Sequence, residues 1–177
     1  MVMGSSWATK NWHAEGYRQL LAWVLKTTAM GVVLVGDRSQ KHTARKVRDG
    51  FESNRLVDLT GRTSLLELTA ILGRAAAGIG PDSGPGHLAA AVGAPYVTLF
   101  GPTPPDRVVP YRCEDLAVLS DTPCAGCYRK QCPYPECTCM TAITPEKVAA
   151  QLKKALALQA PALRSSYFET SRSSKKR

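Results

Sequence analysis

The residues that offer the clearest chemistry lie between two apolar segments in the middle of the chain. The sequence reads Gly-Pro-Asp-Ser-Gly-Pro-Gly-His-Leu over residues 80–88 and continues into an alanine-rich stretch. Small residues at Ser83, Gly84 and Gly86 allow a ligand to approach the backbone closely. A helix that begins here would offer unpaired N–H groups at the positive end of its dipole. This combination predicts a site for an anion, most naturally a phosphate group.

Alternating strands and helices are predicted to position this turn. Such alternation is typical of a doubly wound α/β fold with a mainly parallel sheet. Ser64, with Glu67 three residues later, matches a capping box at the start of one helix. Strands are expected at residues 32–36, 56–59, 76–80, 96–100 and 116–119, and helices at 14–28, 39–51, 65–73, 85–92 and 144–158.

The two ends of the chain depart from this alternation. Residues 1–6 supply almost no strand, although a doubly wound sheet usually has its first strand near the centre. We therefore expect the chain to begin inside a domain. Residues 1–160 are predicted to form one α/β domain, truncated at its N-terminus, and residues 161–177 a disordered basic tail.

The formal net charge of +9 suits an anionic partner. The basic residues are scattered apart from the tail, and the familiar reader motifs are missing, so no nucleic-acid partner is expected. No apolar run reaches the roughly 18 residues of a membrane span, and the chain does not open on a secretory signal pattern. These features predict a cytoplasmic protein.

Three motifs together resemble glycosyltransferase family 9, the heptosyltransferases of lipopolysaccharide core synthesis. They are Thr-Lys-Asn-Trp at residues 9–12, Asp-Ser-Gly-Pro-Gly-His-Leu-Ala-Ala-Ala at 82–91 and Phe-Gly-Pro-Thr at 100–103. The similarity runs from about Gly4 to Leu158, in the order that the family shows for its carboxy-terminal, nucleotide-sugar-binding half. The amino-terminal half is missing.

The resemblance implies a Rossmann-like domain, the carboxy-terminal half of a two-domain GT-B glycosyltransferase, with a Cys-rich loop and a C-terminal helix. It implies inverting transfer of a sugar from a nucleotide-diphosphate sugar, such as ADP-heptose, to a lipopolysaccharide core glycolipid, with no required cofactor. The implied partners are the nucleotide sugar, the glycolipid acceptor and the missing amino-terminal domain. The glycolipid acceptor and the basic tail suggest peripheral attachment to the inner face of the inner membrane.

The resemblance also assigns site residues. Asp82, Ser83, Gly84 and His87 would line the donor pocket, and Lys10 would stabilise charge on the leaving diphosphate. The family's catalytic base belongs to the missing half. A plain helix cap is the alternative for Asp82 and Ser83, a core imidazole for His87 and a surface lysine for Lys10.

Two threonines complete the predicted substrate-binding set. Thr9 belongs to the same motif as Lys10, and Thr103 offers a hydroxyl at the carboxyl edge of the sheet, where open α/β folds bind ligands. Four departures from the family pattern are apparent. His13 replaces a common proline, Pro81 a small polar residue, and Gly86 a larger apolar residue. Residues 37–42 lack the acidic ribose contact, for which Gln40 is a weak substitute.

Five of the six cysteines crowd into residues 124–139, and this crowding favours reduced thiols over a disulfide scaffold. Ordinary thiols in a compact loop are the favoured interpretation, and a zinc site is the alternative. The candidate ligands are Cys124, Cys127, Cys132, Cys137 and Cys139.

Two other functions remain open at this point. A truncated gene could encode a non-catalytic remnant or binding module that keeps the fold without turnover. A zinc-binding regulatory protein built on the cysteine cluster is the third candidate, and its basic tail would then contact nucleic acid.

Overall fold

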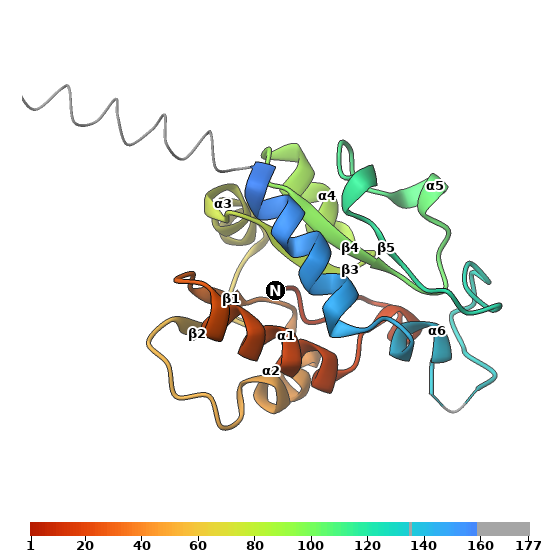
Figure 1. The fold of residues 1–177 in the computed structure, drawn as a ribbon, viewed down its shortest axis with the longest axis horizontal. Coiled ribbons are helices and arrows are strands. Elements are labelled where there is room, and N and C mark those ends of the chain that lie inside the picture. The colour runs from red at the N-terminus through yellow and green to blue at the C-terminus, as the bar shows by residue number, and fades with distance from the viewer. Residues whose placement is uncertain (135, 159–177) are drawn as a thin grey trace, which may run out of the picture.

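The computed structural model describes residues 1–134 and 136–158, and the predicted tail at 161–177 lies outside them. The strands form two parallel groups (Figure 1). The first group pairs β1 (Val32–Leu34) with β2 (Leu56–Asp58). The second has the order β3 (Gly78–Pro81), β4 (Tyr96–Phe100) and β5 (Val118–Leu119).

The first residues of the chain lie between these two groups. The main chain of residues 1–3 bonds to Val33 and Val35 on one side at 2.7 to 2.9 Å, and to Ile79 of β3 on the other at 2.7 Å. Residues 1–3 therefore take the central place between β1 and β3. The prediction that residues 1–6 supply almost no strand agrees with the structure, in which only Val2 forms an isolated bridge, to Val35. The central position of residues 1–3 was not predicted, because it depends on hydrogen bonds to distant residues.

Helices cover both faces of the sheet, as expected for a doubly wound fold. Met3 and Leu34 pack in a core cluster that also holds buried residues of α1 (Ala14–Thr27) and of the helix over residues 145–158. Val2 and Val35, next to them in sequence, pack in a second cluster, with residues of α3 (Leu65–Arg74) and α4 (Gly84–Ala91). This alternation shows that neighbouring side chains point to opposite faces.

Most predicted elements are confirmed with small shifts at their ends. The predicted helix at residues 39–51 divides into η2 (Arg38–Gln40) and α2 (Lys41–Arg48), because Asp37 and Gln40 form a capping box of their own. The predicted capping box at the start of α3 is present. Four short helices lie in segments without predicted structure: η1 (Ala8–Lys10), α5 (Pro105–Val108), η3 (Glu114–Leu116) and α6 (Thr138–Thr141).

A tyrosine explains the glycines around the predicted anion turn. A Cβ built on Gly78 or Gly80 would lie 2.5 Å from the Tyr96 side chain, and one on Gly86 would lie 3.0 Å from its ring. Tyr96 is fully buried and fills the space between β3 and α4. A side chain at residue 86 would crowd the Tyr96 ring, because this ring already fills the space beside Gly86.

Candidate functional site

An open cavity of about 570 Å³ lies where the strands end and α4 begins. Segments that follow three neighbouring strands line it: Ser5 after residues 1–3, Asp37 after β1, and Asp82 to Pro85 after β3. The carboxyl edge of a parallel sheet is the usual binding position in open α/β folds. The cavity brings together five of the seven predicted site residues: Lys10, Asp82, Ser83, Gly84 and His87.

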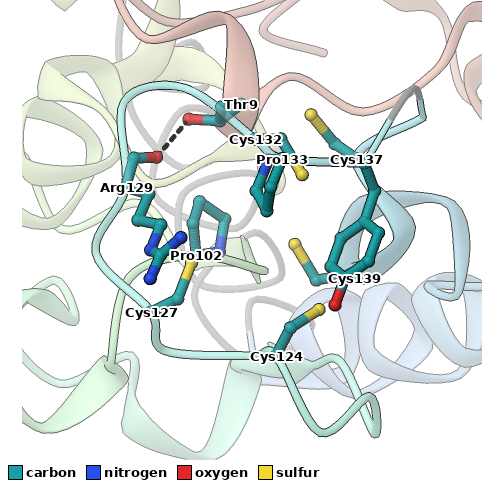
Figure 2. A pocket seen from close by; sticks show the side chains of 10 residues that line it. Thr9, Pro102, Cys124, Cys127, Arg129, Cys132, Pro133, Cys137 and Cys139 are labelled. Carbon is teal, nitrogen blue, oxygen red and sulfur yellow. Dashed lines mark hydrogen bonds between the residues drawn. The ribbon is translucent and has the colours of Figure 1, made fainter.

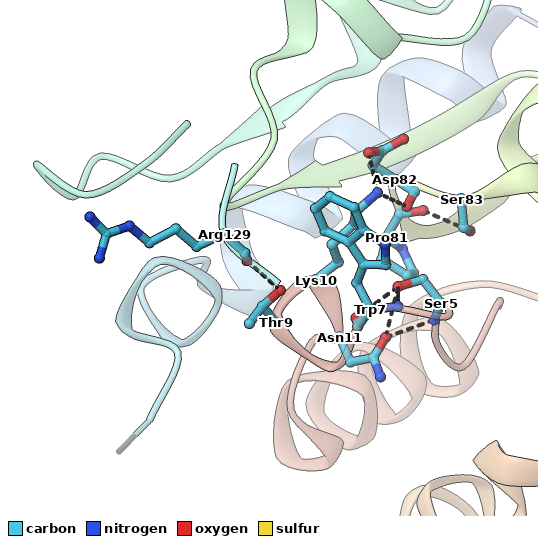
Figure 3. A network of polar contacts seen from close by, with 9 residues as sticks. All are labelled: Ser5, Trp7, Thr9, Lys10, Asn11, Pro81, Asp82, Ser83 and Arg129. Carbon is cyan, nitrogen blue, oxygen red and sulfur yellow. Dashed lines mark hydrogen bonds and ion pairs between the residues drawn. The ribbon is translucent and has the colours of Figure 1, made fainter. Parts of the chain in front are cut away.

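Lys10 and Asp82 form an ion pair at the wall of this cavity (Figure 3). The Lys10 Nζ lies 2.8 Å from the Asp82 Oδ2, and the side chains are only 15% and 7% exposed. The same ammonium lies 4.5 Å from the centre of the Trp7 ring, a cation–π contact. The Asp82 carboxylate holds the Lys10 ammonium at a defined point beside the start of α4.

A small hydrogen-bond network fixes the segment that carries Lys10. The Asn11 Oδ1 accepts from the Ser5 N–H at 2.7 Å, and the Ser5 hydroxyl donates to the Trp7 carbonyl at 2.9 Å (Figure 3). These bonds join the end of the central strand to η1. The sequence motif contains Asn11 but did not reveal this positioning role.

The start of α4 leaves its first amides available to a ligand. The Ser83 hydroxyl donates to the Pro81 carbonyl at 3.1 Å instead of capping the helix. A Cβ built on Gly84 would meet no atom of the described residues within 4 Å, so the space beside it is open. His87 lines the same cavity one turn further on. Unpaired amides, the helix dipole and the nearby Lys10 ammonium favour an anion at this point.

The two predicted threonines lie elsewhere. The Thr9 hydroxyl donates to the Arg129 carbonyl at 3.0 Å, and Thr9 lines a different pocket, the one formed by the cysteines. Thr103 is 2% exposed, and its hydroxyl oxygen has no hydrogen-bond partner within the described part of the chain. Neither threonine lines the main cavity, because Thr9 bonds to the cysteine loop and Thr103 is buried in the interior.

Several other lining residues were not predicted from the sequence. Asp37 lines the cavity, and hydrogen bonds from Ser39 lower the pKa of its carboxyl group, so it stays ionised. Gln40 is 6% exposed, and its side-chain amide already bonds to the Asp37 N–H and the Ser39 hydroxyl. Gln40 is therefore poorly placed to replace a ribose contact. Leu65, Leu68 and Tyr128 add apolar and aromatic surface to the same cavity.

The five clustered cysteines line a second pocket of about 190 Å³ (Figure 2). All six cysteines of the chain are free thiols. Burial, followed by the nearby thiols, raises the pKa of Cys139 to about 11, so its thiol is neutral at neutral pH. Within residues 1–134 and 136–158, no three thiol, imidazole or carboxylate groups already stand in a metal-holding arrangement.

The fold and the cavity together define a doubly wound α/β domain with an open cavity at the carboxyl edge of its sheet. Residues 1–138 match the sequence profile of glycosyltransferase family 9 (heptosyltransferase). The chain therefore belongs to glycosyltransferase family 9, and the resemblance in its three motifs is confirmed.

Individual relatives agree with this assignment. The chain is 30% identical over 167 residues to lipopolysaccharide heptosyltransferase 1 of Pseudomonas aeruginosa, covering 86% of this chain and 46% of that protein. Two Escherichia coli structures share the fold. ADP-heptose lipopolysaccharide heptosyltransferase II is 22% identical with a TM-score of 0.70, covering 89% and 46% of the two chains. Heptosyltransferase WaaC with ADP is 18% identical with a TM-score of 0.66, covering 87% and 42%.

The chain thus spans about half the length of the relatives it matches. This coverage is consistent with the carboxy-terminal half of a GT-B enzyme, the fold class predicted from the sequence. Across the described residues, none of the helices has the length and apolarity needed to cross a bilayer.

Proposed function

We propose that this chain is the donor-binding domain of an inverting heptosyltransferase that uses a nucleotide-diphosphate sugar of the ADP-heptose type. The observation that carries the proposal is the cavity in which the Lys10 ammonium and the open start of α4 face the same space. In this proposal the diphosphate lies on the amides of Ser83 and Gly84, and His87 contacts it from the next turn. Related structures of the E. coli heptosyltransferase WaaC contain ADP or ADP-2-deoxy-2-fluoro heptose, which supports this donor class.

Lys10 has a catalytic role in this proposal. Negative charge grows on the diphosphate as the bond to the sugar breaks, and a fixed cation nearby stabilises that charge. Asp82 holds the ammonium in place through the 2.8 Å ion pair and is not a phosphate ligand. Thr9 and Thr103 then support the walls and do not touch the donor.

The acceptor and the catalytic base are assigned to a separate domain. Of the carboxylates that line the cavity, Asp82 is paired with Lys10, and Asp37 accepts from the Ser39 N–H and hydroxyl. We therefore place the base that deprotonates the acceptor hydroxyl outside this chain. The proposed acceptor is a lipopolysaccharide core glycolipid, which would bring the complete enzyme to the cytoplasmic membrane surface.

Gly84→Ala is the most specific test of the diphosphate position. No atom of the described residues lies within 4 Å of the added methyl group, so only a bound ligand would meet it. Calorimetric titration with ADP should show affinity at least roughly tenfold weaker than wild type, since the methyl group occupies space meant for the diphosphate. Gly73→Ala in α3 is the matched control, because its Cβ would meet only ordinary contacts at 3.7 Å. Equal ADP affinity in wild type and Gly84→Ala would contradict the placement of the diphosphate.

Lys10→Met and His87→Ala test the side chains of the site. Each should weaken ADP binding roughly tenfold, about 1.4 kcal/mol. Lys147→Met and His42→Ala are matched controls, since Lys147 pairs with Asp121 and neither residue lines the cavity. The charge-balanced variant Lys10→Met/Asp82→Asn checks that lost binding does not come from an unpaired buried carboxylate. Unchanged affinity in all three variants would remove the donor-site assignment.

A binding module without turnover is the second candidate function. It is favoured by the engagement of both lining aspartates, which leaves neither free to act as the base. A transfer assay distinguishes the two functions. In this assay the chain is combined with an amino-terminal half from a relative and supplied with ADP-heptose and acceptor. Heptosyl transfer that is lost in Lys10→Met supports the enzyme, and ADP binding without transfer supports the module.

A further inference from the structure

The cysteine pocket is the strongest feature that the donor-site proposal does not use. Cys124, Cys127, Cys132, Cys137 and Cys139 all line one cavity of about 190 Å³, and Figure 2 shows their side chains reaching into it from the loop that encircles it. The other described residues of the lining carry no carboxylate or imidazole. The donor set of this pocket is therefore made of sulfur.

The main chain brings these thiols together. The Gly126 N–H donates to the Gly101 carbonyl at 2.9 Å, and the Tyr128 N–H donates to the Pro102 carbonyl at 2.6 Å, so both hold the loop on the end of β4. A Cβ on Gly101 would lie 2.4 Å from the Met140 sulfur and 3.0 Å from the Cys139 sulfur. Gly101 and Pro102 of the Phe-Gly-Pro-Thr motif thus lie directly beside the thiol pocket.

The loop has few apolar contacts of its own. Residues 125–131 are all exposed, and within residues 121–134 only Cys124 packs against the main apolar core. The Tyr128 ring contacts the Trp7 ring edge-on at 5.4 Å between centroids, and the Lys130 ammonium lies 5.0 Å from the centre of the same Trp7 ring. The five clustered cysteines are free thiols, so they are available as ligands, and a bound metal would add cross-links to this exposed segment.

We propose that the five clustered cysteines supply a four-thiolate site for one divalent metal ion of the zinc class. Thiolate ligands select such borderline-soft ions over magnesium or calcium, and zinc takes four of them in a tetrahedron with Zn–S distances of about 2.3 Å. The sulfurs of the described structure are not yet in this arrangement, so binding requires side-chain rotation and release of the thiol protons. This proposal does not depend on donor binding.

The test uses the full 177-residue chain, reduced and stripped of metal under anaerobic conditions. Cobalt(II) is the probe because a tetrahedral thiolate site gives it charge-transfer and intense d–d absorption bands. We expect these bands to saturate at one cobalt per chain and to vanish when zinc is added. Absence of the bands, or the finding of acid-labile sulfide in the protein as isolated, would overturn the proposal.

Variants then identify the ligands. Cys132→Ser/Cys137→Ser leaves at most three pocket thiols, and we expect competition with a chromogenic chelator to show zinc affinity reduced roughly a hundredfold or more. Cys113→Ala is the matched control, since Cys113 is buried beside Tyr96 in the other core cluster. Unaltered cobalt bands in the double variant would contradict the assignment. Should that variant fail to fold, the wild-type cobalt titration alone still decides the question.

Discussion

The turn between β3 and α4 and the loop that carries the cysteines both contribute side chains to the candidate cavity, and they are stabilised in different ways. The turn between β3 and α4 belongs to the sheet, and all four residues of β3 are buried. The cysteine loop, residues 121–139, is largely exposed and is joined to the body by backbone bonds to Gly101 and Pro102 and by the Thr9 hydroxyl. Packing sets the geometry of the first region, and a few polar bonds and the thiols set that of the second.

Because of this difference, global unfolding should report on the turn, and local opening should report on the cysteine loop. Changes in the turn or in the strands below it should alter the free energy of global unfolding. Changes in the cysteine loop should alter local opening while global stability is nearly constant, because exposed loops open independently of the core. The predictions below begin with pH dependence, and the three tests by substitution that follow run from the largest expected effect to the smallest.

His13 should make the stability of the fold depend on pH. Burial lowers the pKa of His13, whose Nδ1 accepts from the Gly16 N–H and caps α1. The unfolded chain therefore binds more protons around the ordinary histidine pKa of 6.5, and stability falls as pH falls through this value. His13→Asn keeps a capping side chain without a titrating group, so urea unfolding at several pH values should show a weaker pH dependence than in wild type. Identical profiles for the two proteins would mean that the His13 ring is not held neutral at the start of α1.

Gly80→Ala should be the most damaging single change in the turn region. The new Cβ would lie 2.5 Å from the Tyr96 hydroxyl oxygen and 2.7 Å from the Val2 Cβ, both in the packed interior. We expect about 3 kcal/mol of destabilisation from overpacking, measured by chemical unfolding. Gly84→Ala, four residues away in open space, should leave stability within about 0.5 kcal/mol of wild type. Similar losses in both variants would mean that the packing around Tyr96 is not tight.

The Lys10 and Asp82 pair should show an intermediate effect. A double-mutant cycle of Lys10→Met, Asp82→Asn and the combined variant should give a coupling energy of about 2 kcal/mol, because the pair is largely shielded from solvent. The exposed pair of Lys147 and Asp121 is the matched control and should couple by less than about 1 kcal/mol. Equal coupling in the two pairs would mean that Lys10 is solvated and free to move.

Thr9→Val should have the smallest global effect and a clear local one. The change removes the bond from the Thr9 hydroxyl to the Arg129 carbonyl while keeping the side-chain volume. A lost neutral hydrogen bond of about 1 kcal/mol corresponds to roughly fivefold faster trypsin cleavage after Arg129 and Lys130, since cleavage follows the population of the open loop. Thermal unfolding should be nearly unchanged. A large fall in thermal stability with no change in cleavage would assign Thr9 to the core.

The parts of this molecule that the sequence predicted are those with a repeated or local signal. The apolar stripe of α1 and the paired Ser64 and Glu67 define their helices through near neighbours, and both are confirmed. The central position of residues 1–3 could not be predicted, because it is defined by hydrogen bonds to residues more than 30 positions away.

The site shows the same division. Five predicted residues meet in one cavity because two motifs, each local in sequence, lie at neighbouring strand ends. Thr9 and Thr103 belong to equally clear motifs, yet neither lines this cavity, since Thr9 bonds to the Arg129 carbonyl and Thr103 is buried. A motif does not indicate which way each side chain points. Leu68 reaches the cavity from α3, and Asp37 does so from the segment 37–42, in which an acidic contact was expected to be missing, so the folded arrangement was needed to identify both.

The position of residues 1–3 has a practical consequence for labelling the protein. Their main chain lies between β1 and β3, beside an apolar cavity of about 470 Å³ that Met1, Val32 and Gly78 help to line. A charged or polar label attached to these residues would lie against that apolar wall. Fluorescent labels therefore belong on exposed side chains such as Lys26, in the last turn of α1.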